Sequence, residues 1–287
     1  MSARPGQELA YAKINLSLDV LGKREDGYHE LVMVMETVDL ADTLTFLHEG
    51  EGLRVESQVS FLPTDRSNLA AAAALAFQKG TGYKVEPLVI QVDKRIPVCA
   101  GTAGGSSDAA AVLRYLNRAM DARLSLAELQ AIGETVGSDV PYCVMGGTAL
   151  AEGRGERLTA LPPLPKCAVV LCKPNFSIST GALFNQIDRC KIRRRPDTRG
   201  IVAALEAHDL HGVARRLYNV FEDVLPPRQK RTVENIKNTL VNQGALGAAM
   251  TGTGPTVFGL FDDETTAQAA CEELLKYYPN TFLCHTV

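Results

Sequence analysis

The sequence lacks the features that mark several large classes of protein. Its 287 residues carry a formal net charge of −3, so no excess of positive charge points to nucleic acid or to an anionic membrane as a partner. No apolar run approaches the length of a membrane span, and residues 1–9 do not resemble a signal peptide. The seven cysteines are scattered without a Cys-x-x-Cys pair, which favours reduced thiols over disulfides or zinc ligands. These absences predict a cytoplasmic protein that binds neither nucleic acid nor membranes.

Two common phosphate-binding motifs are also missing. The chain contains no Gly-x-x-x-x-Gly-Lys-Ser/Thr loop, and it lacks the Gly-x-Gly-x-x-Gly spacing of dinucleotide-binding proteins. Instead, a run of very small residues at 96–107 leads directly into an alanine-rich segment that is typical of a helix. The glycines Gly101, Gly104 and Gly105 can take backbone angles closed to other residues and let a ligand lie against the main chain.

The start of that helix is the expected phosphate site. Ser106 or Ser107 is predicted to cap the helix and to leave free backbone N–H groups at its first turn. Free N–H groups at a helix start attract anions, so the loop and helix together suggest binding of a nucleoside triphosphate. The alternative is a tight loop packed on a neighbouring strand, where glycine is needed only for steric reasons.

The composition predicts two globular domains. Of all residues 46% are hydrophobic and 22% charged, which allows a substantial core, and the length exceeds that of one ordinary domain. The proline-rich segment at 161–165 is the expected boundary, which gives domains of residues 1–160 and 161–287. Beyond it, the expected order is a strand at 167–173, helices, strands at 247–250 and 256–261, a helix at 264–275 and a strand at 281–286. That order predicts a ferredoxin-like α+β sandwich.

Residues 11–20 alternate strictly between apolar and polar side chains. This period of two predicts a strand, and it places Lys13 and Asn15 side by side on the polar face. Simple solvent exposure of that face is the alternative to a functional role. Further strands are expected at 31–40, 43–47, 53–59 and 88–92, and a helix at 70–77 after Ser67 or Asn68.

Asp139 lies in a constrained turn. A helix at 126–136 with a capping box at Ser125 and Glu128 is expected to stop at residue 137. Pro141 is expected to end any helical tendency, and residues 142–151 suggest a strand. An aspartate in such a turn most often bonds to its own backbone, which is the alternative to a chemical role.

Three separated stretches resemble the motifs of the GHMP kinases. They are Lys-Ile-Asn-Leu at 13–16, the loop at 97–110 and Thr-Gly-Thr-Gly-Pro-Thr at 251–256, in the family's order across nearly the whole chain. The segments 26–31, 137–141 and 153–156 are similar to the branch that acts on a cytidylylated methylerythritol. The resemblance implies an α+β fold of two domains. The N-terminal one would be like domain 2 of ribosomal protein S5, and the C-terminal one a ferredoxin-like α/β sandwich.

The resemblance also implies an activity. The γ-phosphate of ATP would pass to the 2-hydroxyl of 4-diphosphocytidyl-2-C-methyl-D-erythritol, a step of the non-mevalonate route to isoprenoid precursors. ATP and Mg²⁺ are the implied cofactors, this small molecule is the implied partner, and we expect a monomer or weak homodimer. The alternatives are another GHMP kinase acting on homoserine, mevalonate or a sugar, and a non-catalytic regulator that senses nucleotides on the same fold.

Two residues would carry the chemistry that the resemblance implies. Asp139 would accept the proton of the substrate hydroxyl, and Lys13 would keep Asp139 ionised and offset charge on the transferred phosphoryl group. An ordinary structural ion pair is the alternative. Ser106 or Ser107 would be the nearest protein contact to Mg²⁺. The ATP phosphates would contact a continuous set of residues, namely Pro97, Val98, Cys99, Ala100, Gly101, Thr102, Ala103, Gly104, Gly105, Ser106 and Ser107.

A second group would bind the cytidine end of the substrate. Tyr28 and Phe184 would sandwich the cytosine ring, and His29 would bond to the edge of the base. Asn15 and Thr180 would contact the erythritol and phosphate portion. Half-buried packing is the alternative for the two aromatic residues. In the loop, Cys99, Ala100 and Ala103 stand where many family members have glycine, which narrows the conformations open to the backbone.

Overall fold

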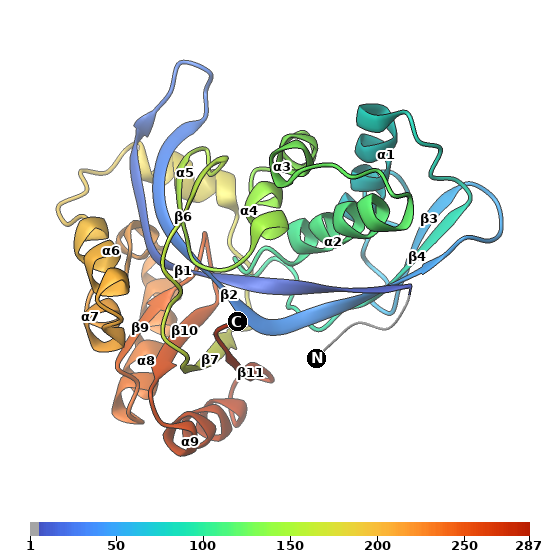
Figure 1. Ribbon diagram of the computed structural model, residues 1–287. Helices are drawn as coiled ribbons and strands as arrows, with labels where there is room; N and C mark the ends of the chain where they lie inside the picture. The colour runs from blue at the N-terminus through green and yellow to red at the C-terminus, as the bar shows by residue number, and fades with distance from the viewer. Residues whose placement is uncertain (1–5) are drawn as a thin grey trace. The chain divides into compact units, whose positions relative to one another are not determined.

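The chain forms two compact units, each assembled from segments that are not contiguous in sequence. The structure is a computed structural model that describes residues 6–287 (Figure 1). The first unit contains residues up to Ala12 together with Leu40–Val98 and Ala103–Gly146. The second contains Lys13–Asp39, Cys99–Thr102 and Gly147–Val287. None of the helices in this part of the chain is long and apolar enough to cross a membrane.

Two long strands, β1 (Gln7–Lys23) and β2 (His29–Leu47), contribute to both units. The predicted strand at 11–20 lies inside β1, and its apolar residues are buried as expected. The polar face is buried too, because Lys13, Asn15, Ser17 and Asp19 are all nearly inaccessible to solvent. The simple alternative of a solvent-exposed polar face is therefore wrong. The two strands predicted at 31–40 and 43–47 are one continuous strand, β2.

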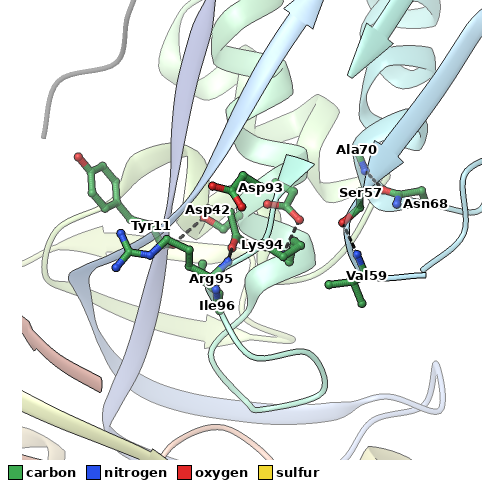
Figure 2. Close-up of polar contacts among 12 residues, drawn as sticks. Tyr11, Asp42, Ser57, Val59, Asn68, Ala70, Asp93, Lys94, Arg95 and Ile96 are labelled. Carbon is green, nitrogen blue, oxygen red and sulfur yellow. Dashed lines mark hydrogen bonds and ion pairs between the residues drawn. The ribbon is translucent and has the colours of Figure 1, made fainter. Parts of the chain in front are cut away.

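In the described residues, the first unit combines a small set of strands with four helices. In order they are β3 (Leu53–Ser57), α1 (Leu69–Thr81), β4 (Leu88–Asp93), α2 (Gly104–Ala119), α3 (Leu126–Glu134) and α4 (Val140–Met145). Strand β4 runs parallel to β3 and antiparallel to the end of β2 that belongs to this unit. Helix α1 packs on α2. The side chain of Asn68 caps α1 by accepting a hydrogen bond from the backbone of Ala70 (Figure 2).

The helices around Asp139 differ in part from the prediction. The capping box of Ser125 and Glu128 is present at the start of α3, as expected. Residues 140–145, however, form α4, and the strand predicted at 142–151 begins only at Ala149. Pro141 starts a helix here instead of ending one. Proline is well tolerated in a first helical turn, where its missing N–H would have no partner in any case.

The second unit contains the predicted ferredoxin-like sheet. Its strands β7 (Ala168–Lys173), β9 (Gly247–Met250), β10 (Val257–Phe261) and β11 (Asn280–His285) form an antiparallel sheet in the spatial order β11-β7-β10-β9. Helices α8 (Pro227–Asn242) and α9 (Glu264–Leu275) pack on it. The connecting segments are α5 (Thr180–Ile187), α6 (Thr198–Glu206), α7 (Leu210–Ala214), β8 (Tyr218–Asn219) and a 3₁₀ turn at Val220–Val224.

The compact units do not coincide with the predicted division at residue 160. Strand β5 (Ala149–Gly153) pairs with β2 at Leu31–Met35, and β6 (Arg157–Ala160) pairs with β5. Residues 149–160 are therefore part of the second unit, ahead of the proline-rich segment. Proline density marks where regular structure stops, but strand pairing decides which segments pack together. The assignment of domains 1–160 and 161–287 stays a prediction.

Candidate active site

The small-residue loop has an unusual backbone. Three of its residues take positive φ angles: Cys99 (53°), Gly101 (79°) and Ala103 (58°). Ala103 is the residue that precedes α2, and the helix itself begins at Gly104. The prediction that Ser106 or Ser107 caps the helix is therefore wrong, because both serines lie inside its first turns. The first backbone N–H groups of α2 still have no partner within the helix, as at any helix start.

The two serines of the loop have different surroundings. Ser107 is buried, and its hydroxyl donates a hydrogen bond to the backbone oxygen of Tyr11 at 2.6 Å. Ser106 is half-buried, and its Oγ lies 4.0 Å from the position that a Cβ on Gly137 would occupy. Ser107 thus fastens α2 to β1 within the first unit. Within residues 6–287, Ser106 is the serine whose hydroxyl is left for another partner.

Asp139 is half-buried at the position that precedes α4, with helical backbone angles (φ −85°, ψ −12°). Within the described residues its carboxylate accepts no capping hydrogen bond from that helix. The alternative of an aspartate that merely bonds its own backbone therefore does not hold here. Asp139 belongs to the first unit, as do Gly104–Ser107 of the loop, whereas Lys13 belongs to the second.

Within the second unit, hydrogen bonds join the three motifs that resemble GHMP kinases. The backbone N–H of Lys13 donates to the carbonyl of Thr102 at 3.2 Å, and that of Thr256 to the carbonyl of Ala100 at 3.3 Å. A Cβ on Gly101 would overlap the carbonyl oxygen of Thr251. Glycine at 101 is thus required by its close approach to the third motif, so the steric alternative is correct for this glycine.

Asn15 is the junction of this network. Its Oδ1 accepts hydrogen bonds from Nζ of Lys13 at 2.6 Å and from the backbone N–H of Gly252 at 2.9 Å. Its own backbone N–H donates to Oγ1 of Thr251 at 3.0 Å. The ammonium of Lys13 is therefore buried and fixed in direction by a neutral amide. Such a fixed positive charge can stabilise negative charge that develops nearby.

The predicted substrate residues form two groups. His29 stacks on Phe184, with ring centroids 4.5 Å apart, and its Nε2 lies 2.7 Å from Oδ1 of Asp188. Tyr28 is more than half exposed, and the guanidinium of Arg154 lies 5.0 Å from the centre of its ring. The ring that stacks on Phe184 is thus that of His29, whereas the prediction places the cytosine between Phe184 and Tyr28.

Thr180 connects the substrate group to the third motif. Its hydroxyl lies 2.9 Å from that of Thr253, and both threonines belong to the second unit. This places the start of α5, which also carries Phe184, beside the segment that bonds to Asn15. The structure therefore brings together, in one unit, Thr180, Phe184 and His29 as predicted members of a substrate site.

Asn219 is a residue of the site that the sequence did not reveal. It is fully buried, and its Nδ2 donates to the carbonyls of Met250 and Gly252, both at 2.8 Å. Its Oδ1 accepts from the backbone of Phe221, whose ring meets Phe184 edge-on at 5.0 Å. Asn219 thus holds the third motif in place. No local pattern around it signals this role, because both bonded carbonyls come from more than thirty residues away.

Known protein families match two parts of this chain, and known relatives match nearly its whole length. Residues 68–147 match the family described as GHMP kinases N terminal domain, and residues 201–280 match GHMP kinases C terminal. The 4-diphosphocytidyl-2-C-methyl-D-erythritol kinase of Clostridium botulinum (strain Eklund 17B / Type B) is 41% identical, covering 97% of this chain and 99% of the relative. The enzyme of the same name from Clostridium perfringens is 44% identical, covering 97% of both chains.

Solved structures show the same likeness. The crystal structure of a 4-(cytidine 5'-diphospho)-2C-methyl-D-erythritol kinase superposes with a TM-score of 0.80 at 31% identity, over 98% of each chain. A homoserine kinase from Cytophaga hutchinsonii (TM-score 0.71, 18% identity, 100% and 96% of the two chains) and the mevalonate kinase of L. major (0.73, 17%, 98% and 95%) share the fold. The two-domain α+β fold expected from the motifs is thereby confirmed, and the chain belongs to the GHMP kinase family.

Proposed function

We propose that this protein transfers the γ-phosphate of ATP to the 2-hydroxyl of 4-diphosphocytidyl-2-C-methyl-D-erythritol. One observation carries the proposal: relatives named for that reaction are 41–44% identical over 97% of the chain. The homoserine and mevalonate kinases share only the fold, at 17–18% identity. The reaction is a step in the non-mevalonate synthesis of isoprenoid precursors.

In this proposal the phosphates of ATP lie on residues 97–107. The free N–H groups at the start of α2 and the exposed backbone of Gly105 suit close contact with phosphate oxygens. Phosphoryl transfer asks a protein mainly to position the reactants and to stabilise charge. Lys13, held by Asn15, supplies the fixed positive charge for the transferred group. Asp139, whose carboxylate does not cap α4 in the described chain, accepts the proton of the attacking hydroxyl.

Mg²⁺ is the expected companion of ATP, and the residues present fit it. Residues 6–287 contain no cluster of three or more His, Cys, Asp and Glu side chains that could enclose a metal ion. Magnesium in kinases commonly keeps several waters and binds mostly to phosphate oxygens, so it needs few protein ligands. The half-buried hydroxyl of Ser106 would be such a ligand, whereas that of Ser107 is already bonded to Tyr11. The ion would neutralise charge on the phosphates.

The cytidine end of the substrate would bind in the second unit. Tyr28 offers an exposed ring, and Phe184 lies on α5 with Thr180 at the start of the same helix. Asn15 would act through Lys13 and Gly252, to which it is bonded, as much as through the substrate. His29 would face the base only with the part of its ring that Phe184 and Asp188 do not occupy.

The remaining expectations concern the protein's surroundings. All seven cysteines are free thiols, which supports a reducing compartment such as the cytoplasm. We expect a monomer or weak homodimer, and light scattering at two protein concentrations would test this.

The decisive experiment is a turnover assay. The protein is incubated with Mg-ATP and the cytidylyl substrate, and release of ADP is followed together with the phosphorylated product. Homoserine, mevalonate and phosphomevalonate serve as competing acceptors. We expect turnover with the cytidylyl substrate alone. Turnover of another alcohol would favour a different kinase of the family, and nucleotide binding without turnover of any acceptor would favour a regulator.

A further inference from the structure

A buried lysine lies between two buried aspartates in the first unit. The Nζ atom of Lys94 is bonded to Oδ2 of Asp42 and lies 2.7 Å from Oδ2 of Asp108. The exposed fractions of the three side chains are 5%, 0% and 9%. Burying an ion cluster of this kind contributes little net stability, since the desolvation of the charges offsets their attraction. The main effect of the cluster is therefore on the local geometry of the chain that it holds.

Asp42 controls the chain just before the loop. Its second oxygen, Oδ1, accepts hydrogen bonds from the backbone N–H groups of Arg95 at 2.5 Å and Ile96 at 2.8 Å. Asp42, Lys94, Arg95 and Ile96 lie together in Figure 2, at the end of β4. The direction in which the chain enters residues 97–103 is therefore set by a single carboxylate.

Lys94 extends this control to the chain just after the loop. Asp108 is the fifth residue of α2, so the bond from Lys94 joins the end of β4 to the beginning of the helix. A Cβ on Gly104, the first residue of α2, would lie 3.3 Å from Nζ of Lys94 and 3.0 Å from Cγ2 of Ile96. The segment 94–96 thus packs directly against the helix start. Both ends of the loop are held by one cluster.

The loop needs such restraint. Cys99 and Ala103 adopt left-handed backbone angles that favour glycine, and such angles persist only where the surrounding structure enforces them. A ligand site that is already in its binding geometry does not lose free energy to ordering when the ligand arrives. Restraint at both ends of the loop would therefore appear as affinity for whatever lies on the start of α2.

We propose that Lys94 is a positioning residue for the nucleotide: by joining Asp42 to Asp108 it holds the start of α2 in the geometry that binds the triphosphate. The identity of the ligand as ATP rests on the proposed function. Asp42, Lys94 and Asp108 are not among the residues proposed to contact the acceptor. Breaking the tie between Lys94 and Asp108 should therefore weaken nucleotide binding and leave the KM for the acceptor unchanged.

The test compares two variants, one that breaks the bond between Lys94 and Asp108 and one that keeps it. Lys94→Met alone would leave two carboxylates buried together, which strongly disfavours folding. The double variant Lys94→Met/Asp108→Asn avoids this and still breaks the tie. The single variant Asp108→Asn keeps a side-chain oxygen that accepts the hydrogen bond from Lys94, so the link between β4 and α2 is conserved. Lys79→Met, an exposed lysine on α1, removes the same charge elsewhere in the first unit and serves as the control.

Binding of a non-hydrolysable ATP analogue with Mg²⁺ is measured by calorimetry, after circular dichroism has confirmed that each variant is folded. We expect the double variant to bind at least tenfold more weakly, and Asp108→Asn and Lys79→Met to stay within about threefold of the parent protein. A folded double variant with the parental Kd would overturn the proposal, as would an equal rise in KM for ATP and for the acceptor. Failure of the parent protein to phosphorylate the cytidylyl substrate would overturn the proposed function, while the binding comparison would still decide the role of Lys94.

Discussion

The side chains of Lys13 and Lys94 are both buried, but their ammonium groups are bonded to different kinds of partner. Lys94 is bonded to two carboxylates, Asp42 and Asp108. Within the second unit, Lys13 donates a hydrogen bond to a neutral group, the amide oxygen of Asn15, at 2.6 Å. A buried charge needs compensation, and the carboxylates bonded to Lys94 compensate that of its ammonium group. The amide beside Lys13 fixes its direction without cancelling its charge.

The difference suggests how a structural lysine can be told from a reactive one, the role that we propose for Lys13. A compensated charge interacts weakly with anything outside its cluster, so Lys94 can influence a ligand only by holding the chain. A charge that a neutral amide orients, as Asn15 orients that of Lys13, can act on negative charge that forms within reach, as phosphoryl transfer requires. Lys13 belongs to a motif that resembles the GHMP kinases, but the sequence around either lysine does not show what its ammonium group is bonded to. The partners of the ammonium group make the distinction.

The largest expected effect comes from the group proposed to work with Lys13. Asp139→Asn keeps the shape of the side chain but removes the proton acceptor, so kcat should fall by roughly 10²–10⁴ while the KM for ATP changes little. Asp121→Asn, an exposed carboxylate of the same unit, is the matched control. A variant that retained more than about a tenth of the parental kcat would show that Asp139 is not the base.

Lys13→Met tests the comparison directly. Methionine retains the apolar stem and removes the charge, so kcat should fall by roughly 10²–10³, as for loss of one transition-state contact. The melting temperature should stay close to that of the parent, because the bond that is lost leaves behind a neutral amide, that of Asn15, and not a buried carboxylate. If Lys13→Met unfolds the protein without a kinetic effect in its folded fraction, Lys13 is a structural residue and the distinction between the two lysines fails.

Glu36 extends the comparison to a buried acid whose hydrogen-bond partners, the hydroxyl of Thr148 and the backbone of Thr37, are neutral. Its Oε2 accepts a hydrogen bond from the hydroxyl of Thr148, and burial raises the pKa of its carboxyl from 4.5 to about 8. The folded protein therefore keeps this group neutral at a pH where the unfolded chain ionises it. Unfolding then releases a proton, so the free energy of unfolding should fall by up to about 1.4 kcal/mol per pH unit between about pH 5 and pH 8.

Glu36→Gln removes that titration while it keeps the acceptor for Thr148. From pH 6 to pH 8 the parent protein should lose about 2–3 kcal/mol more unfolding free energy than the variant, measured by urea unfolding at each pH. Glu49→Gln, an exposed carboxylate, should follow the parent. Parallel pH profiles for Glu36→Gln and the parent would mean that Glu36 is already ionised in the folded state.

The two aromatic residues proposed to stack on cytosine also differ in their surroundings. Phe184 is in contact with His29 and Phe221, whereas Tyr28 is more than half exposed. Tyr28→Leu should weaken binding of the cytidylyl substrate by about 1–3 kcal/mol, seen in KM, with unchanged melting temperature and KM for ATP. Phe184→Leu should cost stability as well. An unaltered KM in the Tyr28 variant would dismiss the stacking role and reopen the choice of acceptor.

The smallest effect concerns the strained residue that precedes α2. Ala103 has a φ angle of 58°, which costs a residue with a Cβ roughly 1–2 kcal/mol relative to the right-handed region. Ala103→Gly should relieve part of this, and after the added entropy of the unfolded chain a gain of about 0.5–1 kcal/mol is expected in thermal unfolding. Ala109→Gly, inside the same helix, should destabilise. A destabilised Ala103→Gly would show that the methyl group has a packing role.

Local periodicity predicted much of the fold. The alternation in residues 11–20, the capping box at Ser125, and the strand and helix order of the C-terminal half all describe local structure that matches the observed elements. Burial of the polar face of β1 was not predictable, because alternation shows which residues share a face and not whether a second layer covers it. The helix that contains Pro141 is not predicted from the sequence, because proline can end one helix or occupy the first turn of the next.

The site was predictable to the extent that motifs carry it. The loop was predicted from its own small residues and the helix after it, Lys13 and Asp139 were predicted from the resemblance, and their chemical roles stay predictions. The Lys94 cluster was beyond sequence reasoning, since its members are separated by 52 and 14 positions. His29 shows the same limit in another form. The resemblance implies that it binds the base, which stays a prediction, and its contact with Phe184 comes from a helix more than 150 residues away.

The repeated crossing of the chain between its two units also limits which fragments of it can fold when expressed alone. The chain passes from one to the other after residues 12, 39, 98, 102 and 146. A fragment that began at residue 147 would lack the stretch 13–39, which supplies the partner of β5. Contacts this distant in sequence slow folding and leave early intermediates with unpaired strand edges. Half-length fragments should therefore aggregate when expressed alone, and complementation by two fragments would succeed only if they assemble while folding.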